Sequence, residues 1–310
     1  MPHDPFHEGE IAVQERAGER DIGRRRSTIF SPRIVPGALE FLAQQRLIAL
    51  SVAGEDAHLW TSVWCGQSGF VDSDDGERVT IRRSLMTIAP DDPVLGRLAV
   101  GRDTGLLAIE LTTRRRLRIN GRVERISPDE IVVRVRESLA NCPKYIQRRR
   151  PREAPAPGPS RPGASGYTID DERRRLVERA DTAFVGSLHP DRGVDASHRG
   201  GEPGFIHVLD AETLRVPDYA GNSMFLTLGN FEVDPRACLA VVDFDRARVV
   251  SFSGRARLRF TGELPGHPTG GTGRYWELVV REWVEFDLPP AMRWDFLDSS
   301  PFNPSCPPRS

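Results

Sequence analysis

The sequence contains a single lysine and no long apolar run. Lys144 is the only lysine among 43 basic residues, so arginine carries nearly all of the positive charge, a bias typical of a GC-rich genome. No apolar stretch approaches the roughly 20 residues of a membrane-spanning helix. The first ten residues, MPHDPFHEGE, lack the basic and apolar regions of a signal peptide. These absences predict a cytoplasmic protein without a membrane partner.

Cysteine and histidine are also sparse and are poorly spaced for metal binding. No CxxC pair occurs among the four cysteines, which are Cys65, Cys142, Cys238 and Cys306. Such isolated cysteines predict reduced thiols rather than a disulfide framework or a zinc site. The seven histidines form no HxH or HExxH pair, so we predict no metal site. The net charge of −1 gives no sign of a nucleic-acid partner.

What the sequence does contain is a linker between two parts of similar size. The stretch RPREAPAPGPSRPGASG is rich in Pro, Gly, Ala and Ser and lacks aliphatic and aromatic side chains, so we expect it to be extended and mobile. The predicted organisation is an N-terminal arm (1–34), a first unit (35–149), the linker (150–166), a second unit (167–288) and a C-terminal tail (289–310).

The two units repeat one pattern, a helix followed by several short alternating strands. TSVWCGQSGFV in the first unit corresponds to DASHRGGEPGFI in the second. Phe70 and Phe205 lie 135 residues apart, and Gly121 and Gly254 lie 133 apart. A nearly constant offset indicates tandem duplication. The fold class is therefore predicted to be mainly β with a few α-helices, arranged as two small antiparallel barrels.

Several stretches carry a resemblance to a known family. They are ADTAFVGSLHPDRGVDASHRGGEPGF, GNSMFLTLGNFEVDPRACLAVVDF and VVSFSGRARL in the second unit, FHEGEIAVQERAG near the N-terminus, and NCPKYIQRR before the linker. With these stretches the chain resembles the FMN-binding split barrels of the pyridoxamine 5′-phosphate oxidase superfamily. It is most similar to a bacterial branch of predicted flavin-nucleotide-binding proteins.

The resemblance implies tandem split β-barrels and a cofactor site between two barrels. In the superfamily FMN is held by its phosphate at the barrel rim, and a dimer partner supplies the second barrel. Because both copies lie in one chain here, we expect the two units to dock as an intrachain pseudo-dimer. Whether two such chains pair further into a homodimer is left open.

VDASHRGGEPGF, which begins at Val194, is the most polar part of the second unit. Side chains alternate along a strand, so Asp195, Ser197 and Arg199 should share one face and His198 the other. That geometry excludes a Ser-His-Asp relay, in which the histidine lies between the other two. Ser197, Arg199 and Gly200 instead offer groups that bind an anion, and the resemblance places flavin contacts here. The alternative is a surface ion pair between Asp195 and Arg199.

GNSMFLTLGN is the second candidate for cofactor binding. In the oxidases the matching stretch carries an asparagine, a serine and basic residues near the flavin phosphate. Asn222 keeps the asparagine, whereas Phe225 and Thr227 stand where serine and lysine would be expected. Arg199, Ser223 and Thr227 would then have to compensate for the missing lysine. The alternative is a glycine-bounded turn followed by the end of a buried strand.

NCPKYIQ is the third candidate. Pro143 suits the first turn of a helix, capped by Asn141 or Cys142. A helix N-terminus beside Lys144 would favour an anion, so Lys144 and Tyr145 could reach a phosphate across the interface of the two units. Cys142 could be reactive in such a place, although no histidine base can be assigned to it. The alternative is a capped helix that only packs.

The first unit lacks the polar set of the second. Trp60 and Trp64, in and beside its TSVWCGQ segment, could be core residues or an aromatic platform for a ligand ring. The first unit is therefore interpreted as a degenerate copy that forms one wall of the site in the second unit. TTRRRLRI, from Thr112 to Ile119, is typical of a solvated edge strand. The last twelve residues, SSPFNPSCPPRS, are expected to be mobile.

The function implied is that of a flavin-dependent oxidoreductase with an unknown substrate and no assignable catalytic residue. A small molecule and NAD(P)H are the candidate partners. The alternative is a non-catalytic flavin, deazaflavin or haem carrier or sensor, in which haem would need His189, His198 or His207 as its axial ligand. The predicted FMN-binding residues are Ser197, His198, Arg199, Gly200, Asn222, Ser223, Thr227 and Lys144.

Overall fold

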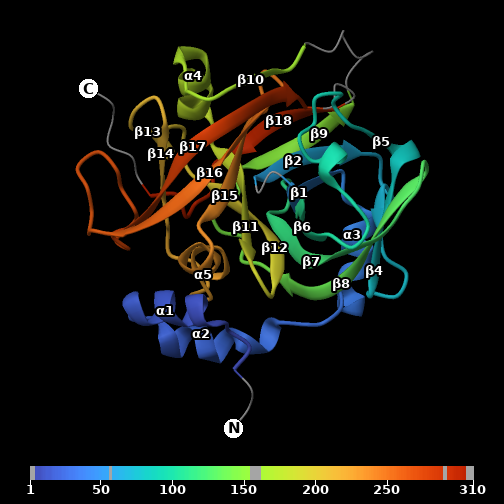
Figure 1. Ribbon diagram of the computed structural model, residues 1–310, viewed down its shortest axis with the longest axis horizontal. Coiled ribbons are helices and arrows are strands. Elements are labelled where there is room, and N and C mark those ends of the chain that lie inside the picture. Colours follow the sequence, from blue (N-terminus) through green and yellow to red (C-terminus); the bar gives the residue numbers. More distant parts are fainter. Residues whose placement is uncertain (1–3, 56–57, 154–161, 289–291, 305–310) are drawn as a thin grey trace.

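The computed structural model describes residues 4–55, 58–153, 162–288 and 292–304, and these residues form two eight-stranded antiparallel sheets (Figure 1). The first sheet has the strand order β3-β4-β8-β7-β6-β1-β2-β5. Its strands are β1 (Leu47–Ala53), β2 (Leu59–Gly66), β3 (Val71–Asp72), β4 (Arg78–Arg82), β5 (Met86–Thr87), β6 (Asp103–Glu110), β7 (Arg115–Ile126) and β8 (Glu130–Ala140).

The second sheet repeats the order of the first. It runs β12-β11-β15-β16-β17-β14-β13, and β10 pairs with β17. Read from its other end, this order is β13-β14-β17-β16-β15-β11-β12, which corresponds strand by strand to β3-β4-β8-β7-β6-β1-β2 in the first sheet. The tandem, mainly β arrangement is therefore confirmed. Its strands are β10 (Ala164–Gly166), β11 (Thr182–His189), β12 (Gly193–Gly200), β13 (His207–Val208), β14 (Thr213–Pro217), β15 (Arg236–Asp243), β16 (Arg248–Phe260) and β17 (Arg274–Asp287).

The helices are short and lie at the edges of the sheets. Each unit enters its first long strand from a helix, as predicted. Helices α1 and α2 lie together beneath α5 (Figure 1). The described helices are α1 (Glu8–Arg16), α2 (Arg20–Arg26), α3 (Leu39–Ala43), α4 (Asp171–Arg179) and α5 (Leu226–Val233), with 3-10 turns at Ser27–Ile29, Pro36–Ala38, Arg83–Leu85 and Leu95–Arg97. None of these described helices is long and apolar enough to cross a membrane.

Three large hydrophobic clusters account for the packing of the two units. Each sheet wraps around its own cluster, with Phe70 in the first and Phe205 in the second. The third cluster joins the outward faces of both sheets and includes Leu107 from β6, Phe184 from β11 and Phe286 from β17. Burial of apolar surface in this shared cluster holds the units together as an intrachain pair.

A small two-stranded sheet corrects two expectations about mobile segments. β9 (Arg148–Glu153) pairs with β18 (Met292–Asp298), and β10 pairs with β17, so both ends of the predicted linker are in strands. The middle of the linker, 154–161, lies outside the described residues. The described start of the tail is also held, because Ser300 accepts a hydrogen bond from the Tyr145 amide at 3.0 Å. Residues 305–310, with Cys306, lie outside the described part.

Candidate functional site

A pocket opens between the two units where β12, β7 and the start of α5 meet. Its cavity volume is about 110 Å³, and it lies within a wider hollow of about 900 Å³ that includes open solvent. We call it the inter-unit pocket. Of the predicted cofactor-binding residues, all but Ser197 line it. The polar and charged lining residues are Arg116, Arg118, Asn141, Cys142, Lys144, Tyr145, His198, Arg199, Asp218, Tyr219, Asn222, Ser223 and Thr227.

The polar residues of β12 have separate partners and form no catalytic relay. The Ser197 hydroxyl lies 3.0 Å from the Thr227 hydroxyl. Asp195 accepts a hydrogen bond from the Asn120 amide at 3.1 Å and lies 3.3 Å from Nη1 of Arg118. His198 instead meets Arg116, which donates to its Nδ1 at 3.1 Å. Asp195 is therefore a buried counter-ion for Arg118 of the first unit, and the alternative of a surface ion pair with Arg199 is wrong.

Two arginines of β7 line the pocket, which corrects the interpretation of TTRRRLRI as a solvated edge. β7 lies between β6 and β8 in the middle of its sheet. Arg118 is only 6% exposed, and its Nε has no hydrogen-bond partner. Arg116 donates from Nε to the carbonyl of Cys142 at 2.9 Å. Because 116 and 118 are two residues apart, both side chains leave the strand on the same face.

The pocket has an excess of positive charge. Burial lowers the pKa of Arg116 to about 9, and the nearby charges of Arg118 and Arg199 add to this effect. Burial also lowers the pKa of Arg199, whose Nε has no hydrogen-bond partner. The carboxylate of Asp218 lines the pocket but is already paired with Arg274, 3.0 Å away. Like charges held together in a partly buried site favour the binding of an anion.

His198 is a neutral imidazole in this cluster. Burial, followed by the charges of Arg116, Arg199 and Arg149, holds its pKa well below the usual 6.5. Since Nδ1 accepts from Arg116, the proton of the neutral ring lies on Nε2, which has no partner. An axial haem ligand needs a free Nε2 lone pair, so this tautomer is unsuited to haem. His189 and His207 do not line the pocket.

GNSMFLTLGN forms a helix rather than the end of a strand. Helix α5 begins after Phe225, which has a left-handed backbone (φ 58°) and provides no side-chain cap. Ser223, two residues earlier, is also left-handed (φ 62°). Non-glycine residues in this conformation are uncommon and collect at functional sites. The first two helical residues, Leu226 and Thr227, line the pocket, and the N–H groups of an uncapped helix N-terminus bind anions.

NCPKYIQ forms a turn, so the predicted helix and its anion-binding N-terminus are wrong. Tyr145 has φ 66°, and its hydroxyl donates to the carbonyl of Ala220 at 2.9 Å. Its ring lies 5.0 Å from that of Tyr219. A Cβ on Gly200 would lie 2.0 Å from the Tyr145 carbonyl, so this approach requires glycine. The turn still brings Cys142, Lys144 and Tyr145 to the pocket.

The equivalent position on the other side of the pseudo-dimer is filled. Positions 133 residues after Arg116 and Arg118 hold Val249 and Ser251 on β16. Val249 lies in the shared apolar cluster, and Ser251 donates to the carbonyl of Thr61 at 2.8 Å. Trp60 and Trp64 belong to the core of the first unit and provide no platform.

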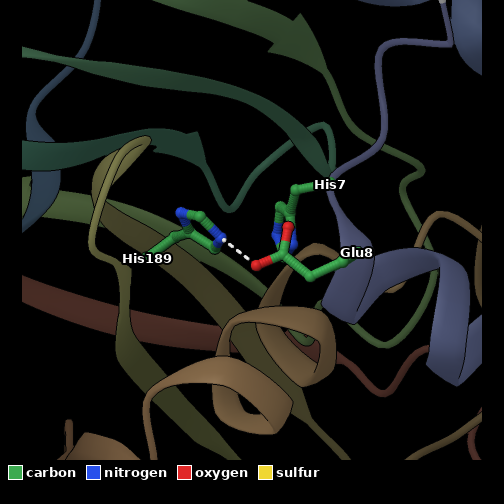
Figure 2. A group of neighbouring side chains, drawn as sticks. All are labelled: His7, Glu8 and His189. Carbon is green, nitrogen blue, oxygen red and sulfur yellow. Dashed lines mark hydrogen bonds and ion pairs between the residues drawn. The ribbon is translucent and has the colours of Figure 1, made fainter.

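His7, Glu8 and His189 form a second cluster outside the pocket (Figure 2). Their possible ligand atoms lie within 4.8 Å of one another. However, Nδ1 of His7 accepts from the Gly9 amide and Nδ1 of His189 from the Asp191 amide. In this arrangement both Nδ1 atoms accept a hydrogen bond, so the proton of each imidazole lies on Nε2, the atom that would have to bind the metal. This hydrogen bonding favours a polar contact of α1 with β11 over a metal site.

No protein-family model matches the sequence, and no curated protein matches it closely. Several solved structures do match parts of the chain at low identity. HupZ from Group A Streptococcus has 16% identity and a TM-score of 0.31, with 40% of this chain and 98% of HupZ covered. A candidate pyridoxamine 5′-phosphate oxidase from Lactobacillus delbrueckii has 13% identity and a TM-score of 0.31, with 37% of this chain and 93% of that protein covered. An F420 reductase has 17% identity and a TM-score of 0.25, with 35% of this chain and 92% of the reductase covered. These likenesses assign no role to any residue of this chain.

Proposed function

We propose that the chain binds FMN in the inter-unit pocket and acts as a flavin-dependent oxidoreductase. The observation that carries this proposal is the meeting of three partly or fully buried guanidinium groups, those of Arg116, Arg118 and Arg199, with the N-terminus of α5, which has no side-chain cap. A phosphate monoester has a charge between −1.5 and −2 at pH 7. Arginine side chains and helix N-termini are the groups that bind such an anion.

The two units supply complementary parts of this binding site. Arg199, Ser223 and the first N–H groups of α5 would hold the phosphate from the second unit. Arg116 and Arg118 of the first unit add the positive charge that the absent lysine of GNSMFLTLGN would have provided. Apolar and aromatic lining residues give surface for a planar ring system, among them Leu107, Phe205 and Tyr219. The bound flavin would supply the redox chemistry, and these residues would bind and orient it.

A carrier or sensor of a flavin or deazaflavin is the second candidate function. It is favoured by His198, the imidazole of the pocket, which is buried and held neutral and therefore unsuited to carry protons during turnover. A visible spectrum of the purified protein separates the two functions. A flavin spectrum bleached by NAD(P)H would support the enzyme, and a bound flavin inert to reductants and to O₂ would support the carrier.

Replacement of Arg199 tests the placement of the phosphate. A charge-assisted hydrogen bond contributes about 1.5–3 kcal/mol, so Arg199→Ala should weaken FMN binding by roughly tenfold or more in a fluorescence titration. The exposed Arg257 on β16 provides the matched control, and Arg257→Ala should leave the affinity unchanged. A wild-type protein that remains colourless with added FMN would contradict the proposed function. If both variants bound FMN with equal affinity, the assigned phosphate site would be wrong, but the proposed function would not be contradicted.

A further inference from the structure

The N-terminal arm packs on α5 with the two helix backbones in direct contact. Helices α1 and α5 cross at Gly9 and Gly229. A Cβ on Gly9 would lie 2.2 Å from the carbonyl oxygen of Gly229, and a Cβ on Gly229 would lie 2.7 Å from the amide nitrogen of Glu10. No side chain fits at either position unless the helices separate. The close contact therefore fixes the position of α5 relative to the arm.

Polar contacts at both ends of α1 hold the same crossing. Nε2 of His7 donates to the side-chain oxygen of Asn230 on α5 at 3.2 Å. Arg16 and Glu232 form an ion pair of 2.7 Å at the other end. Glu8 and His189 connect the start of α1 to β11 at 3.3 Å, as Figure 2 shows.

The arm also contacts the backbone of the loop that precedes α5. Gln14, which is fully buried, donates to the carbonyl of Met224 at 3.2 Å. Arg26 donates to the carbonyl of Gly221 at 3.4 Å. A Cβ on Gly23 would lie 2.9 Å from the carbonyl oxygen of Ser223, so α2 also approaches the loop closely.

Arg274 of β17 connects the arm to the pocket wall. Its guanidinium pairs with Glu19, just before α2, at 2.7 Å and with the pocket residue Asp218 at 3.0 Å. The same group lies 5.0 Å from the centre of the Phe225 ring. Phe225 is the left-handed residue from which α5 starts. One buried cation is therefore shared by the arm, the pocket and the first residue before the anion-binding helix.

From these contacts we propose that the N-terminal arm is a positioning element of the cofactor site. It holds the left-handed Ser223 and Phe225 and thereby directs the free N–H groups of α5 into the inter-unit pocket. Gly9, Gln14 and Glu19 are the positioning residues, and none of them lines the pocket. The inference rests on the proposed cofactor site. Because coupling between two sites is reciprocal, a phosphate-bearing ligand also stabilises the docked arm.

Gly9→Val tests this role in the full chain. A valine at the crossing should separate α1 from α5, so hydrogen exchange at the amides of residues 223–228 should become at least tenfold faster. FMN affinity should fall by at least tenfold. Gly37→Val is the matched control, because a Cβ at the exposed Gly37 meets nothing within 4 Å, and it should change neither measurement. Glu19→Gln, a milder change that removes one ion pair, should alter both in the same direction.

The two measurements separate this proposal from the proposed function. Unchanged exchange at residues 223–228 in Gly9→Val and in Glu19→Gln would overturn the positioning role, as would faster exchange with wild-type FMN affinity. If the wild-type chain binds no FMN, the proposed function fails, and hydrogen exchange alone still decides whether the arm positions α5. If Gly9→Val does not fold, Glu19→Gln decides the question by the same two measurements.

Discussion

At the scale of single residues, Asp195 shows how one carboxylate keeps a cationic pocket stable. It is 3% exposed and lies against Arg118, which is 6% exposed. Beyond Arg118 lie Arg116 and Arg199, whose lowered pKa values show that their charges are already poorly accommodated. Removing the carboxylate would leave a buried cation without its partner among other cations. Such losses destabilise a protein far more than the loss of an exposed pair.

We therefore predict that Asp195→Asn destabilises the protein by about 3–5 kcal/mol, the usual cost of breaking a buried ion pair. Replacing Arg118 as well, in Asp195→Asn/Arg118→Met, should recover a substantial part of that loss because no unpaired charge remains. Urea unfolding of the single and double variants measures both effects. A double variant less stable than Asp195→Asn would show that Arg118 is not the group that Asp195 neutralises.

The sequence could predict the pocket residues of the second unit and Lys144 of the first, but not the two arginines of β7. His198, Arg199 and Asn222 stand out because polar groups and glycines interrupt an apolar pattern. Arg116 and Arg118 lie in a run of arginines, which is usually solvated. The period of two places them on one face of β7, but only the docking of the second unit shows that this face is covered. The available sign that Arg116 and Arg118 are covered was that their run of charges lies on a strand with a central position in the repeat.

At the scale of elements, α5 was missed because its stability comes from its surroundings. It has eight residues, contains a glycine and an asparagine, and is buried on nearly all sides, so it shows no amphipathic period. The turn at Tyr145 was missed for a related reason. Pro143 suits the start of a helix, but the left-handed backbone at Tyr145 ends any helix there, and the carbonyl packs against Gly200 instead. In both cases tertiary contacts override local preference.

The docking of α1 should make stability depend on pH through Glu10. Burial raises the pKa of Glu10 to about 8, with Glu137 and Asp195 adding to the rise and Arg192 opposing it. The folded protein then keeps a proton that the unfolded chain releases above pH 4.5, so stability falls as the pH rises toward 8. His7 acts oppositely at lower pH. Burial lowers its pKa to about 4, so stability is lost as the pH falls from 6.5 to 4.

The His7 contribution no longer changes well above pH 6.5, so the Glu10 effect can be measured there separately from it. We predict that the midpoint temperature of thermal unfolding of the wild type decreases as the pH is raised from 6.5 to 8.5. Glu10→Gln keeps an acceptor for the His7 amide but has no proton to lose, so its midpoint should fall less over the same range. Parallel curves for the two proteins would show that Glu10 titrates normally and that α1 is not docked as described.

At the scale of the whole molecule, the duplication produces two interfaces, and the inter-unit pocket lies at one of them. The pseudo-twofold relation places β12 against β6 and β7, and β2 against β15 and β16. On the first side Arg116 and Arg118 meet His198 and Arg199 around open space. On the second side Val249 and Phe286 pack with Val63 and Cys65 in the shared apolar cluster. One interface thus became a binding site and the other a core.

This asymmetry predicts one cofactor per chain. An FMN titration at protein concentrations well above Kd should reach its endpoint at one equivalent per chain, and native mass spectrometry should show the same mass increase. The pocket is built from both units of one chain, so the ratio should not depend on whether chains associate further. Two equivalents would mean that the Val249 side also opens to ligand. Half an equivalent would mean that the site forms between two chains, and either result would contradict the intrachain pocket as the sole site.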